Sequence, residues 1–467
     1  MADAYVLPPE VANYDFGLRT PYEVQLKTIA LMATEYQGYN LNGLGTGKTF
    51  CTLAAFDILR LQGKLNRLLV AAPLSTLRFV WAAEVLAAFP HLRVEIVYGT
   101  KAKRIAALDR DADVYVINHD GLATVYDEIL FHNEIDALAI DELAVYRNGG
   151  AKRTKLMREI AKRKTWVWGL TGSPMPRDVT DIWGQCSIIT PTTVPKYYNH
   201  LRHQLCYKAG PFAWEARPGA VEQAVGMMRP SVRFSLDDVL ELPEVVTQFV
   251  EVEMGTKQGQ IYKAMKNKAV ALINDQKIDA LNAGAVMSKL LQIATGWVYS
   301  RDGSVVHLDN ENRVQAILDY IDGTQRKALV FLPFKHALEG VSQALKKEGI
   351  KHFKVSGDTP AAERNKIFDA FQNGKGRYPL IAHPACLAHG VTLTAADTII
   401  WGGPTTSLET FQQANARIRR IGQKHKQLVV MLGGTPVEKR VYSLLSSNEL
   451  TQLQFLDLLA KETEQLL

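Results

Sequence analysis

A glycine-rich segment near the N-terminus holds the first residues with recognisable chemistry. Residues 41–50 read LNGLGTGKTF, which brings Gly45, Thr46, Gly47, Lys48 and Thr49 together. Glycines let the backbone turn tightly so that its N–H groups point at phosphate oxygens, and the helix that follows adds its dipole. The sequence therefore predicts a nucleotide site, with Lys48 on the β- and γ-phosphates and Thr49 on Mg²⁺. The alternative is a chance glycine turn.

An acidic pair about 90 residues further on fits the same chemistry. Asp141 and Glu142 close the apolar run ALAIDE at 137–142. Carboxylates at the end of a buried strand are costly unless a cation compensates them. We expect Asp141 to bind Mg²⁺ and Glu142 to polarise the attacking water. The alternative is an acidic pair that begins a helix.

Two arginines in the last third of the chain could complete a phosphoryl-transfer site. Residues 413–423 read QANARIRRIGQ, with Arg417 and Arg420 three residues apart. This spacing predicts that both lie on one face of a helix. Guanidinium groups suit a γ-phosphate on which charge develops, so Gln413, Arg417 and Arg420 are candidate catalytic residues. The alternative is a basic face that contacts DNA or solvent.

A strongly basic segment follows the acidic pair. Residues 152–164, KRTKLMREIAKRK, hold seven basic residues and one acidic residue. That segment alone has a net charge of +6, the same as the whole chain. It is either a surface for a polyanion or a solvated helix face.

Short apolar runs that alternate with amphipathic stretches position these residues. In the first third, runs bounded by turn signals occur at 67–73, 113–119, 137–142 and 165–172. The last third has five more, at 327–333, 351–357, 378–384, 397–403 and 427–434. Strands that alternate with helices predict an α/β fold with parallel sheets. The middle, 186–300, reads as helical, and 240–254 is expected to cross between the lobes and end in a strand.

Composition limits the class of protein. The chain has 467 residues, 47% hydrophobic and 22% charged, which is typical of a globular protein of two or three domains. It has no apolar run long enough for a membrane span and no basic-then-apolar secretory signal. The four scattered cysteines indicate neither a disulfide framework nor a zinc site, so a reducing cytoplasm is expected.

Taken together, the motifs resemble those of Swi/Snf-type ATPases of helicase superfamily 2, in a minimal bacterial or phage form. The matching segments, in family order, are PYEVQ (21–25), NGLGTGKT (42–49), APLSTLRFVWAAE (72–84), INHDGL (117–122), DELA (141–144), LTGSP (170–174), VSGDTPAAER (355–364), HGVTLTAAD (389–397) and QANARIRRIGQ (413–423). Within the third segment, Trp81 and Glu84 match the family's Trp-x-x-Glu. Two positions depart from the family pattern: Asn42 stands where the family has Asp, and Leu-Ala follows Asp141-Glu142 in place of Ala-His.

The resemblance implies two RecA-like lobes with a helical insertion between them, and ATP and Mg²⁺ bound between the lobes. The implied parts are lobe 1 at 1–185, the insertion and crossing segment at 186–300, and lobe 2 at 301–467. Gln25 would read the adenine, and Thr171, Ser173 and Gly390 would couple the lobes. The implied DNA contacts are Pro73, Ser75, His119, Lys152, Arg153, Lys155, Gly357 and Thr392.

The function implied is that of a monomeric ATPase that moves along double-stranded DNA without sequence specificity, in a bacterial or infected host cytoplasm. A strand-separating helicase is one alternative, and a nucleic-acid-binding scaffold without ATPase activity is another. A small-molecule kinase is excluded because it needs no second lobe with paired arginines. The tryptophans of predicted strands are expected in the core, and no aromatic stripe beside a basic groove is visible, which favours duplex binding.

Overall fold

The computed structural model describes residues 6–17, 19–210, 214–234, 243–274, 280–299, 305–387, 391–420 and 423–447. It divides into two compact units, Met1–Glu241 and Leu242–Leu467. No helix in these described ranges is long and apolar enough to cross a membrane.

Unit 1 is built on a seven-stranded sheet whose strands all run parallel, in the order β3-β4-β2-β5-β6-β1-β9. The strands are β1 (Gln37–Asn40), β2 (Arg67–Ala72), β3 (Val94–Val97), β4 (Val114–Asn118), β5 (Ile135–Ile140), β6 (Trp166–Leu170) and β9 (Ser231–Val232). The central strands are buried apolar runs, as expected for a sheet covered by helices on both faces.

Helices cover both faces of this sheet, because alternate residues of each strand enter two different cores. Leu68 and Val70 pack with α2 (Glu23–Thr34), α3 (Lys48–Leu61) and α4 (Ala83–Ala88). Leu69 and Ala71 pack on the other face with α5 (Lys101–Leu108), α6 (Tyr126–Leu130), α7 (Lys152–Ala161) and α8 (Ile182–Ile189). Trp166 and Trp168 are buried in the first of these cores, as predicted for strand tryptophans.

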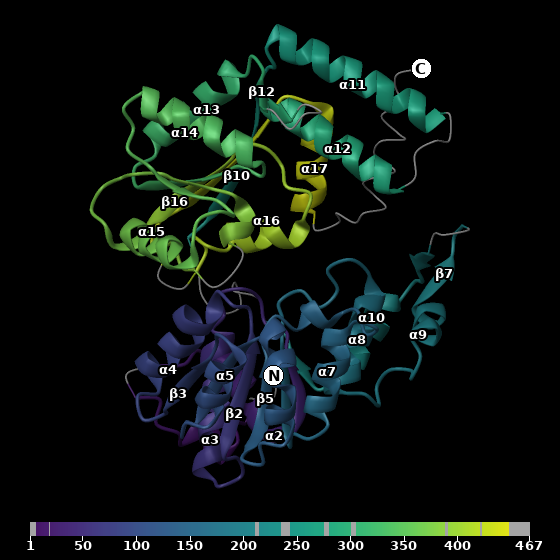
Figure 1. Ribbon diagram of the computed structural model, residues 1–467, viewed down its shortest axis with the longest axis vertical. Helices are drawn as coiled ribbons and strands as arrows, with labels where there is room; N and C mark the ends of the chain where they lie inside the picture. The colour runs from purple at the N-terminus through teal and green to yellow at the C-terminus, as the bar shows by residue number, and fades with distance from the viewer. Residues whose placement is uncertain are drawn as a thin grey trace. The chain divides into compact units, whose positions relative to one another are not determined.

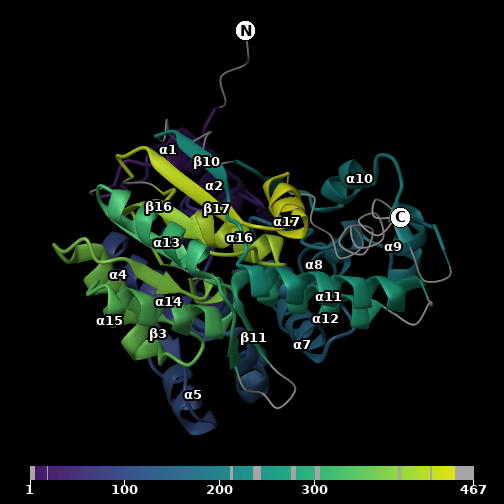
Figure 2. The same cartoon turned by 90° about the horizontal axis from the view of Figure 1, so that it is seen from above.

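Shorter elements complete unit 1. The first helix is α1 (Pro9–Ala12), and four short helical segments connect longer elements: η1 (Leu77–Ala82), η2 (His119–Val125), η3 (Leu143–Tyr146) and η4 (Val179–Asp181). Beyond α8, the chain adds α9 (Tyr198–Leu205), the antiparallel pair β7 (Cys206–Lys208) and β8 (Trp214–Ala216), and α10 (Ala220–Met227). These last elements lie on the far side of α8 from β3 (Figures 1 and 2).

Unit 2 contains a six-stranded parallel sheet in the order β10-β17-β16-β13-β15-β14. The strands are β10 (Val245–Glu251), β13 (Lys327–Phe331), β14 (Phe353–Val355), β15 (Leu380–Ala382), β16 (Ala396–Trp401) and β17 (Gln427–Gly433). The first strand of this unit therefore pairs with its last strand, over seven residues from Val245 to Glu251.

The helices of unit 2 also lie on both faces of the sheet. One face carries α13 (Glu311–Gly323) and α14 (Lys335–Lys347). The other carries α11 (Thr256–Asn274), α12 (Ala280–Thr295), α15 (Ala361–Asn373), α16 (Leu408–Asn415) and α17 (Pro436–Ser446). A two-stranded ribbon, β11 (Trp297–Tyr299) and β12 (Val305–His307), and the short helix η5 (Pro384–Leu387) complete it. Figure 2 shows α11 and α12 side by side.

These features confirm the predicted α/β class with two parallel-sheet lobes. The strand at 245–251, which joins the sheet of unit 2, confirms the strand expected within 240–254. β-branched residues dominate this segment, VVTQFVE, which explains its extended conformation. The rest of the middle region differs from its helical reading because it also supplies strands: 231–232 adds an edge strand to the sheet of unit 1, and 206–208, 214–216 and 297–299 form parts of two-stranded ribbons.

Candidate nucleotide site and nucleic-acid surface

The glycine-rich segment is the turn between β1, which ends at Asn40, and α3, which begins at Lys48. Gly45 and Gly47 have φ angles of 80° and 87°, a left-handed conformation that L side chains adopt at a cost. A Cβ atom on Gly47 would also lie 2.5 Å from Nε2 of Gln25. The turn therefore requires glycine at this position, and its N–H groups lie at a helix N-terminus.

Gln25 connects α2 to this turn. Its Nε2 donates to the carbonyl oxygen of Thr46 at 2.9 Å, and its Oε1 accepts from the backbone N–H of Tyr22 at 3.1 Å. The side chain is 6% exposed. Gln25 thus contacts the phosphate-binding turn directly, which is compatible with its predicted place in a nucleotide site; the reading of adenine stays a prediction.

Lys48 and Asn42 occupy opposite ends of the turn. The Nζ atom of Lys48 donates to the carbonyl oxygens of Asn42 and Gly43, both at 2.9 Å. The Asn42 side chain is buried, donates to Oγ1 of Thr28 at 2.8 Å and accepts from the backbone N–H of Phe234 at 2.9 Å. Asn42, which stands where the family has Asp, therefore links α2, the glycine-rich turn and the segment after β9.

Asp141 follows β5, which is separated from β1 by three strands in chain order but by only one strand, β6, in the sheet. Its Oδ2 accepts from the indole Nε1 of Trp81 at 2.9 Å, and its Oδ1 accepts from the N–H of Glu142 at 3.0 Å. Burial raises the pKa of Asp141, while the Trp81 hydrogen bond and the charge of Lys48 act in the opposite direction. A cation bound here would relieve the cost of that burial.

Glu142 has a strained backbone. Its φ is 49° and its ψ is 52°, and within the described residues it is the one residue other than glycine with a positive φ. Such conformations cost about 1–3 kcal/mol and gather at functional sites. The observation supports, independently of the motif, a functional position at the end of β5.

The predicted coupling residues of unit 1 follow β6. The backbone N–H of Thr171 donates to the carbonyl oxygen of Asn40 at the end of β1, at 3.1 Å. Its hydroxyl oxygen accepts from the N–H of Ser173 at 3.2 Å. Thr171 and Ser173 are therefore held beside the start of the glycine-rich turn. Gly390, the third predicted coupling residue, lies outside the described residues.

Three of the predicted DNA contacts follow strands of unit 1. Pro73 is half-buried and Ser75 is exposed just after β2. His119 follows β4, but it is 7% exposed and its Nδ1 lies 3.0 Å from the hydroxyl of Tyr146. The imidazole of His119 is thus largely covered, so Ser75 offers the more accessible contact.

The basic segment divides into two groups of side chains. Lys152, Arg153 and Lys155 are exposed near the N-terminus of α7, where Arg153 forms an ion pair with Asp120 at 2.6 Å. Two other basic residues of the segment, Arg158 and Lys164, point toward the interior of unit 1. Arg158 donates to Oγ of Ser187 at 2.8 Å, and Lys164 donates to two backbone carbonyls, with burial lowering its pKa to about 8.

The arginine pair of unit 2 does not share a helix face, contrary to the prediction. The helix α16 ends at Asn415, and residues 416–420 form turns. The side chain of Arg417 is 1% exposed, with its Nε donating to the carbonyl oxygen of Gln413 at 2.9 Å and an NH group donating to Val391 at 3.2 Å. These hydrogen bonds hold the Arg417 guanidinium inside the unit.

Arg420 lies closer to the surface than Arg417. It donates to Oγ1 of Thr392, a predicted DNA contact, at 3.0 Å, and to the carbonyl oxygen of Ala416 at 3.2 Å. Burial lowers its pKa to about 10, so it stays charged at neutral pH. Gly357, the other predicted DNA contact of unit 2, is exposed after β14.

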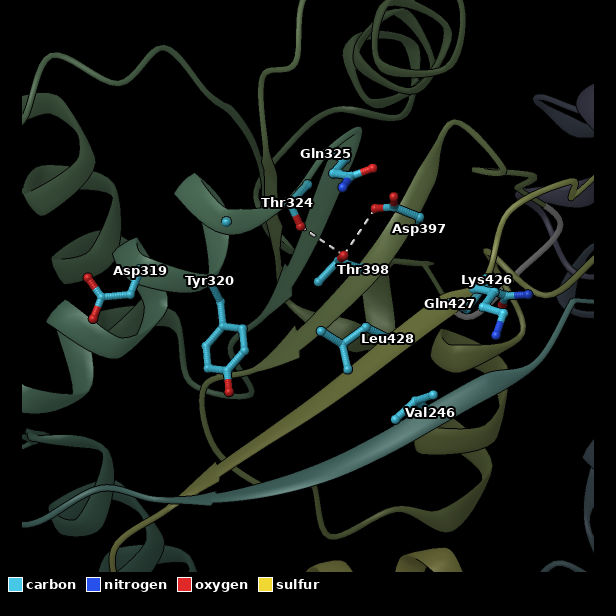
Figure 3. Close-up of a pocket in the computed structure, with 11 residues that line it drawn as sticks. Val246, Asp319, Tyr320, Thr324, Gln325, Asp397, Thr398, Lys426, Gln427 and Leu428 are labelled. Atoms are coloured by element: carbon cyan, nitrogen blue, oxygen red, sulfur yellow. Dashed lines mark hydrogen bonds between the residues drawn. The ribbon is translucent and has the colours of Figure 1, made fainter.

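A hollow of about 580 Å³ in unit 2 is unrelated to these residues (Figure 3). It lies at the amino-terminal ends of β16 and β17 and is lined by Tyr320, Thr324 and Thr398 among others. The hydroxyls of Thr324 and Thr398 bond each other at 2.8 Å, and Thr398 donates to Asp397 at 3.0 Å. Ligands of open parallel sheets bind at the carboxyl ends of strands, so this hollow lies at the wrong edge.

One residue that the sequence reasoning left out of the site is Trp81. It is fully buried on η1, a π-helical turn, and its indole N–H fixes a carboxylate oxygen of Asp141. Trp81 matches the family's Trp-x-x-Glu pattern together with Glu84. No local pattern, however, indicates that its hydrogen-bond partner, Asp141, lies 60 residues further along the chain. π-Helical turns occur frequently at functional sites.

The residues of unit 1 fit a nucleotide with Mg²⁺. The glycine-rich turn, Lys48 and Thr49 follow β1, and Asp141 follows β5 at the same edge of the sheet. The charge of Lys48 acts on the pKa of Asp141, as expected of groups that share a phosphate and metal site.

Comparison with known proteins gives two family matches. The SNF2-related domain matches residues 24–296, and the helicase conserved C-terminal domain matches residues 312–422. The first match covers more than half of the chain and includes the glycine-rich turn and the acidic pair.

Similar proteins come from phage, bacteria and animals. Protein p41 of Acyrthosiphon pisum secondary endosymbiont phage 1 is 30% identical, over 80% of this chain and 83% of its own length. An uncharacterized ATP-dependent helicase of Mycoplasma genitalium is 23% identical over 88% of this chain. A SWI/SNF-related regulator of chromatin, subfamily A-like protein 1, from Xenopus laevis is 21% identical over 81%. The alignments cover about two fifths of the length of the last two relatives (39% and 38%).

Among solved structures, the Sulfolobus solfataricus SWI2/SNF2 ATPase core in complex with dsDNA covers 93% of each chain, with 20% identity and a TM-score of 0.42. The Sulfolobus solfataricus SWI2/SNF2 ATPase core domain is 22% identical over 92% of this chain and 91% of its own, with the same TM-score.

Proposed function

Because the chain belongs to the SNF2-related family of helicase-like ATPases, we propose that it is an ATP-driven translocase on double-stranded DNA. The observation that carries the proposal is the edge of the unit 1 sheet where the glycine-rich turn, Lys48 and the Trp81-bound Asp141 come together. The relatives named as an ATP-dependent helicase and as a regulator of chromatin support ATP-driven action on DNA.

Each residue at this edge has a proposed role. The N–H groups of the turn and Lys48 bind the phosphates, Gln25 contacts the adenine, and Thr49 and Asp141 hold Mg²⁺. Mg²⁺ would neutralise charge that develops on the phosphate oxygens. Glu142 positions and polarises the attacking water, and Thr171 and Ser173 connect this site to the end of β6.

The second unit would supply the arginines and the remaining contacts. We propose that Arg420, with Arg417 and Gln413, acts on the γ-phosphate, and that Gly357 and Thr392 contact the DNA backbone. The exposed Ser75, Lys152, Arg153 and Lys155 of unit 1 would contact phosphates as well. Contacts of this kind carry no sequence information, so binding would be independent of sequence. We further propose that the protein acts as a monomer in a reducing cytoplasm.

The first test is hydrolysis by two variants. Lys48→Ala should weaken ATP binding because the phosphates lose their cation. Glu142→Gln should keep ATP binding and lose hydrolysis because the water loses its polarising group. Turnover and binding of a fluorescent ATP analogue are measured without nucleic acid and with duplex DNA, single-stranded DNA or RNA.

The proposal expects the greatest stimulation from duplex DNA. Wild-type turnover in both variants would contradict the ATPase assignment. Stimulation by single strands alone would instead support the strand-separating alternative, and stimulation by RNA alone would contradict a DNA substrate.

A further inference from the structure

A row of rings runs along α9 and onto the neighbouring hairpin of unit 1. The Tyr197 ring meets His200 edge to face, with centroids 5.6 Å apart, and His203 meets Trp214 in the same way at 4.8 Å. His200 and His203 lie three residues apart in α9 and are therefore neighbours on its surface. We call Tyr197, His200, His203 and Trp214 the ring row.

The core of unit 1 accounts for only one ring of this row, Trp214, which packs against it. Leu201 and Leu205 form the buried side of α9. Tyr197 is 58% exposed, His200 and His203 are exposed, and Trp214 is half-buried. Tyr197, His200 and His203 thus face solvent on the side that the core leaves open, and a cluster of exposed rings of this kind can mark a binding surface.

Cations accompany the rings. The Nζ atom of Lys196 lies 5.6 Å from the centre of the Tyr197 ring, and the guanidinium of Arg202 lies 4.3 Å from that of Trp214. Residues 196–217 carry four basic side chains (Lys196, Arg202, Lys208 and Arg217) against a single acidic one, Glu215. The charge is complementary to a polyanion.

We propose that the ring row binds unpaired nucleotides of a nucleic-acid strand. Rings stack on bases only where the faces of the bases are free, whereas a duplex keeps those faces covered by its own stacking. Cations beside the rings would then contact the phosphates of the same strand. This inference rests on the proposed function and extends it. A translocase on duplex DNA would have a second, separate contact for a strand that is locally unpaired.

The fold brings together what the sequence keeps apart. The sequence shows no aromatic stripe, because Trp214 lies 11 residues beyond His203 and reaches it only when β8 folds back on β7. Figure 1 shows α9 and β7 on the far side of α8 from β3, the edge strand of the unit 1 sheet.

The test compares affinities of the full-length chain for two labelled probes. One is oligothymidylate of about 20 nucleotides, longer than the ~4–16 nucleotides that a single-strand site covers, and the other is a blunt duplex of equal length. Tyr197→Ala should weaken single-strand binding about tenfold, the effect of losing one stacked base. Duplex affinity should change less than twofold, and duplex-stimulated ATP hydrolysis should stay the same.

Two further variants make the result specific to stacking. Tyr197→Phe keeps the ring and should bind single strands like the wild type. Tyr36→Ala is the matched control, because Tyr36 is also an exposed tyrosine of unit 1, at 61%, and lies outside the row. It should change neither affinity.

Three outcomes would overturn the proposal. They are unchanged single-strand affinity in Tyr197→Ala, an equal loss of affinity for both probes, and a loss in Tyr197→Phe as large as in Tyr197→Ala. Unchanged single-strand affinity would indicate that the ring row binds a protein partner instead. An equal loss for both probes would indicate that the row contacts phosphates of any nucleic acid. Failure of duplex DNA to stimulate the wild-type ATPase would overturn the proposed function, but it would leave the comparison of single-strand affinities readable.

Discussion

Among single residues, Trp81 has the most informative contact. It lies on the same short π-helical turn as Arg78 and Phe79, both exposed, and a few residues after Ser75. Its own indole is buried and bonded to Asp141. One turn of backbone therefore connects a surface proposed to contact nucleic acid with the carboxylate proposed to hold Mg²⁺.

Replacing Trp81 with Phe should raise the Mg²⁺ concentration needed for half-maximal hydrolysis by roughly tenfold. The reason is that Asp141 loses a hydrogen bond to a charged group, which is worth about 1.5–3 kcal/mol. Binding of the nucleotide without Mg²⁺ should change little. A Mg²⁺ titration of ATPase rate measures the effect.

Trp168→Phe is the matched control for that experiment. Trp168 is equally buried, yet its indole Nε1 has no hydrogen-bond partner in the described part of the chain. Both variants lose the same atoms from a packed core, and only one loses a bond to the site. Equal Mg²⁺ dependence in the two variants would refute a positioning role for Trp81.

The two arginines of unit 2 should behave differently when replaced. Arg420→Ala should keep the fold and nucleic-acid binding but reduce stimulated hydrolysis strongly, since an arginine in phosphoryl transfer contributes about 10³–10⁵ in rate. Arg417→Ala should also lower the melting temperature, because the buried guanidinium bonds the carbonyls of Gln413 and Val391. Stimulated turnover and thermal melting are measured together, and full turnover in Arg420→Ala would remove Arg420 from the site.

At the scale of elements, α7 shows how a charged run divides on folding. The sequence presents seven basic residues as one group, but α7 directs Arg158 to Ser187, and Lys164, which follows the helix, donates to backbone carbonyls. Only residues on the outer side, including Lys152 and Lys155, can contact a polyanion. Composition indicates the total charge, and the period of the helix decides where that charge is available.

Replacing Lys152 and Lys155 with Ala should therefore weaken duplex binding equally for all sequences. The slope of log affinity against log salt should become shallower by about 2, since each phosphate contact contributes about 0.9. ATP hydrolysis without DNA should stay the same. Titrations at several salt concentrations give the slope. Lys162→Ala, at an exposed position directly after α7, is the comparison variant.

The strands and the glycine-rich turn are the elements that sequence predicts best. Their apolar runs and turn residues are local, and each predicted run of the first and last thirds overlaps a strand. The position of Arg417 was not predictable in this way, because it lies beyond the end of α16 and bonds the carbonyl of Val391, which is 26 residues distant. Two other features could not be predicted for the same reason, since each depends on contacts between separate elements. They are the hydrogen bond between Trp81 and Asp141 and the ring row.

For the whole molecule, the two units supply different parts of one proposed reaction. Unit 1 contains the glycine-rich turn and the acidic pair, and unit 2 contains the arginines. Each unit has its own sheet with a core on each face. Under the proposed function, the two units together would move the protein along duplex DNA without separating its strands.

The translocase proposal predicts displacement of the third strand from a triplex in the presence of ATP, while a tailed duplex stays paired. The activity should fall steeply as salt rises, because the contacts are with phosphates. Gel assays on one protein preparation compare both substrates, with Glu142→Gln as the inactive control. Rapid separation of the tailed duplex would favour the helicase alternative.

The pairing of β10 with β17 also determines the order in which unit 2 can be completed during synthesis. The ribosome releases β10 about 180 residues before it releases β17, its partner along the whole strand. At roughly 5–20 residues per second, β10 waits for about 10–35 s with an open hydrogen-bonding edge. All the strands of unit 1 have emerged by then, so unit 1 can fold while unit 2 is incomplete. A strand with neither edge paired is prone to aggregate, so a chaperone bound to β10 in that interval would protect the nascent chain.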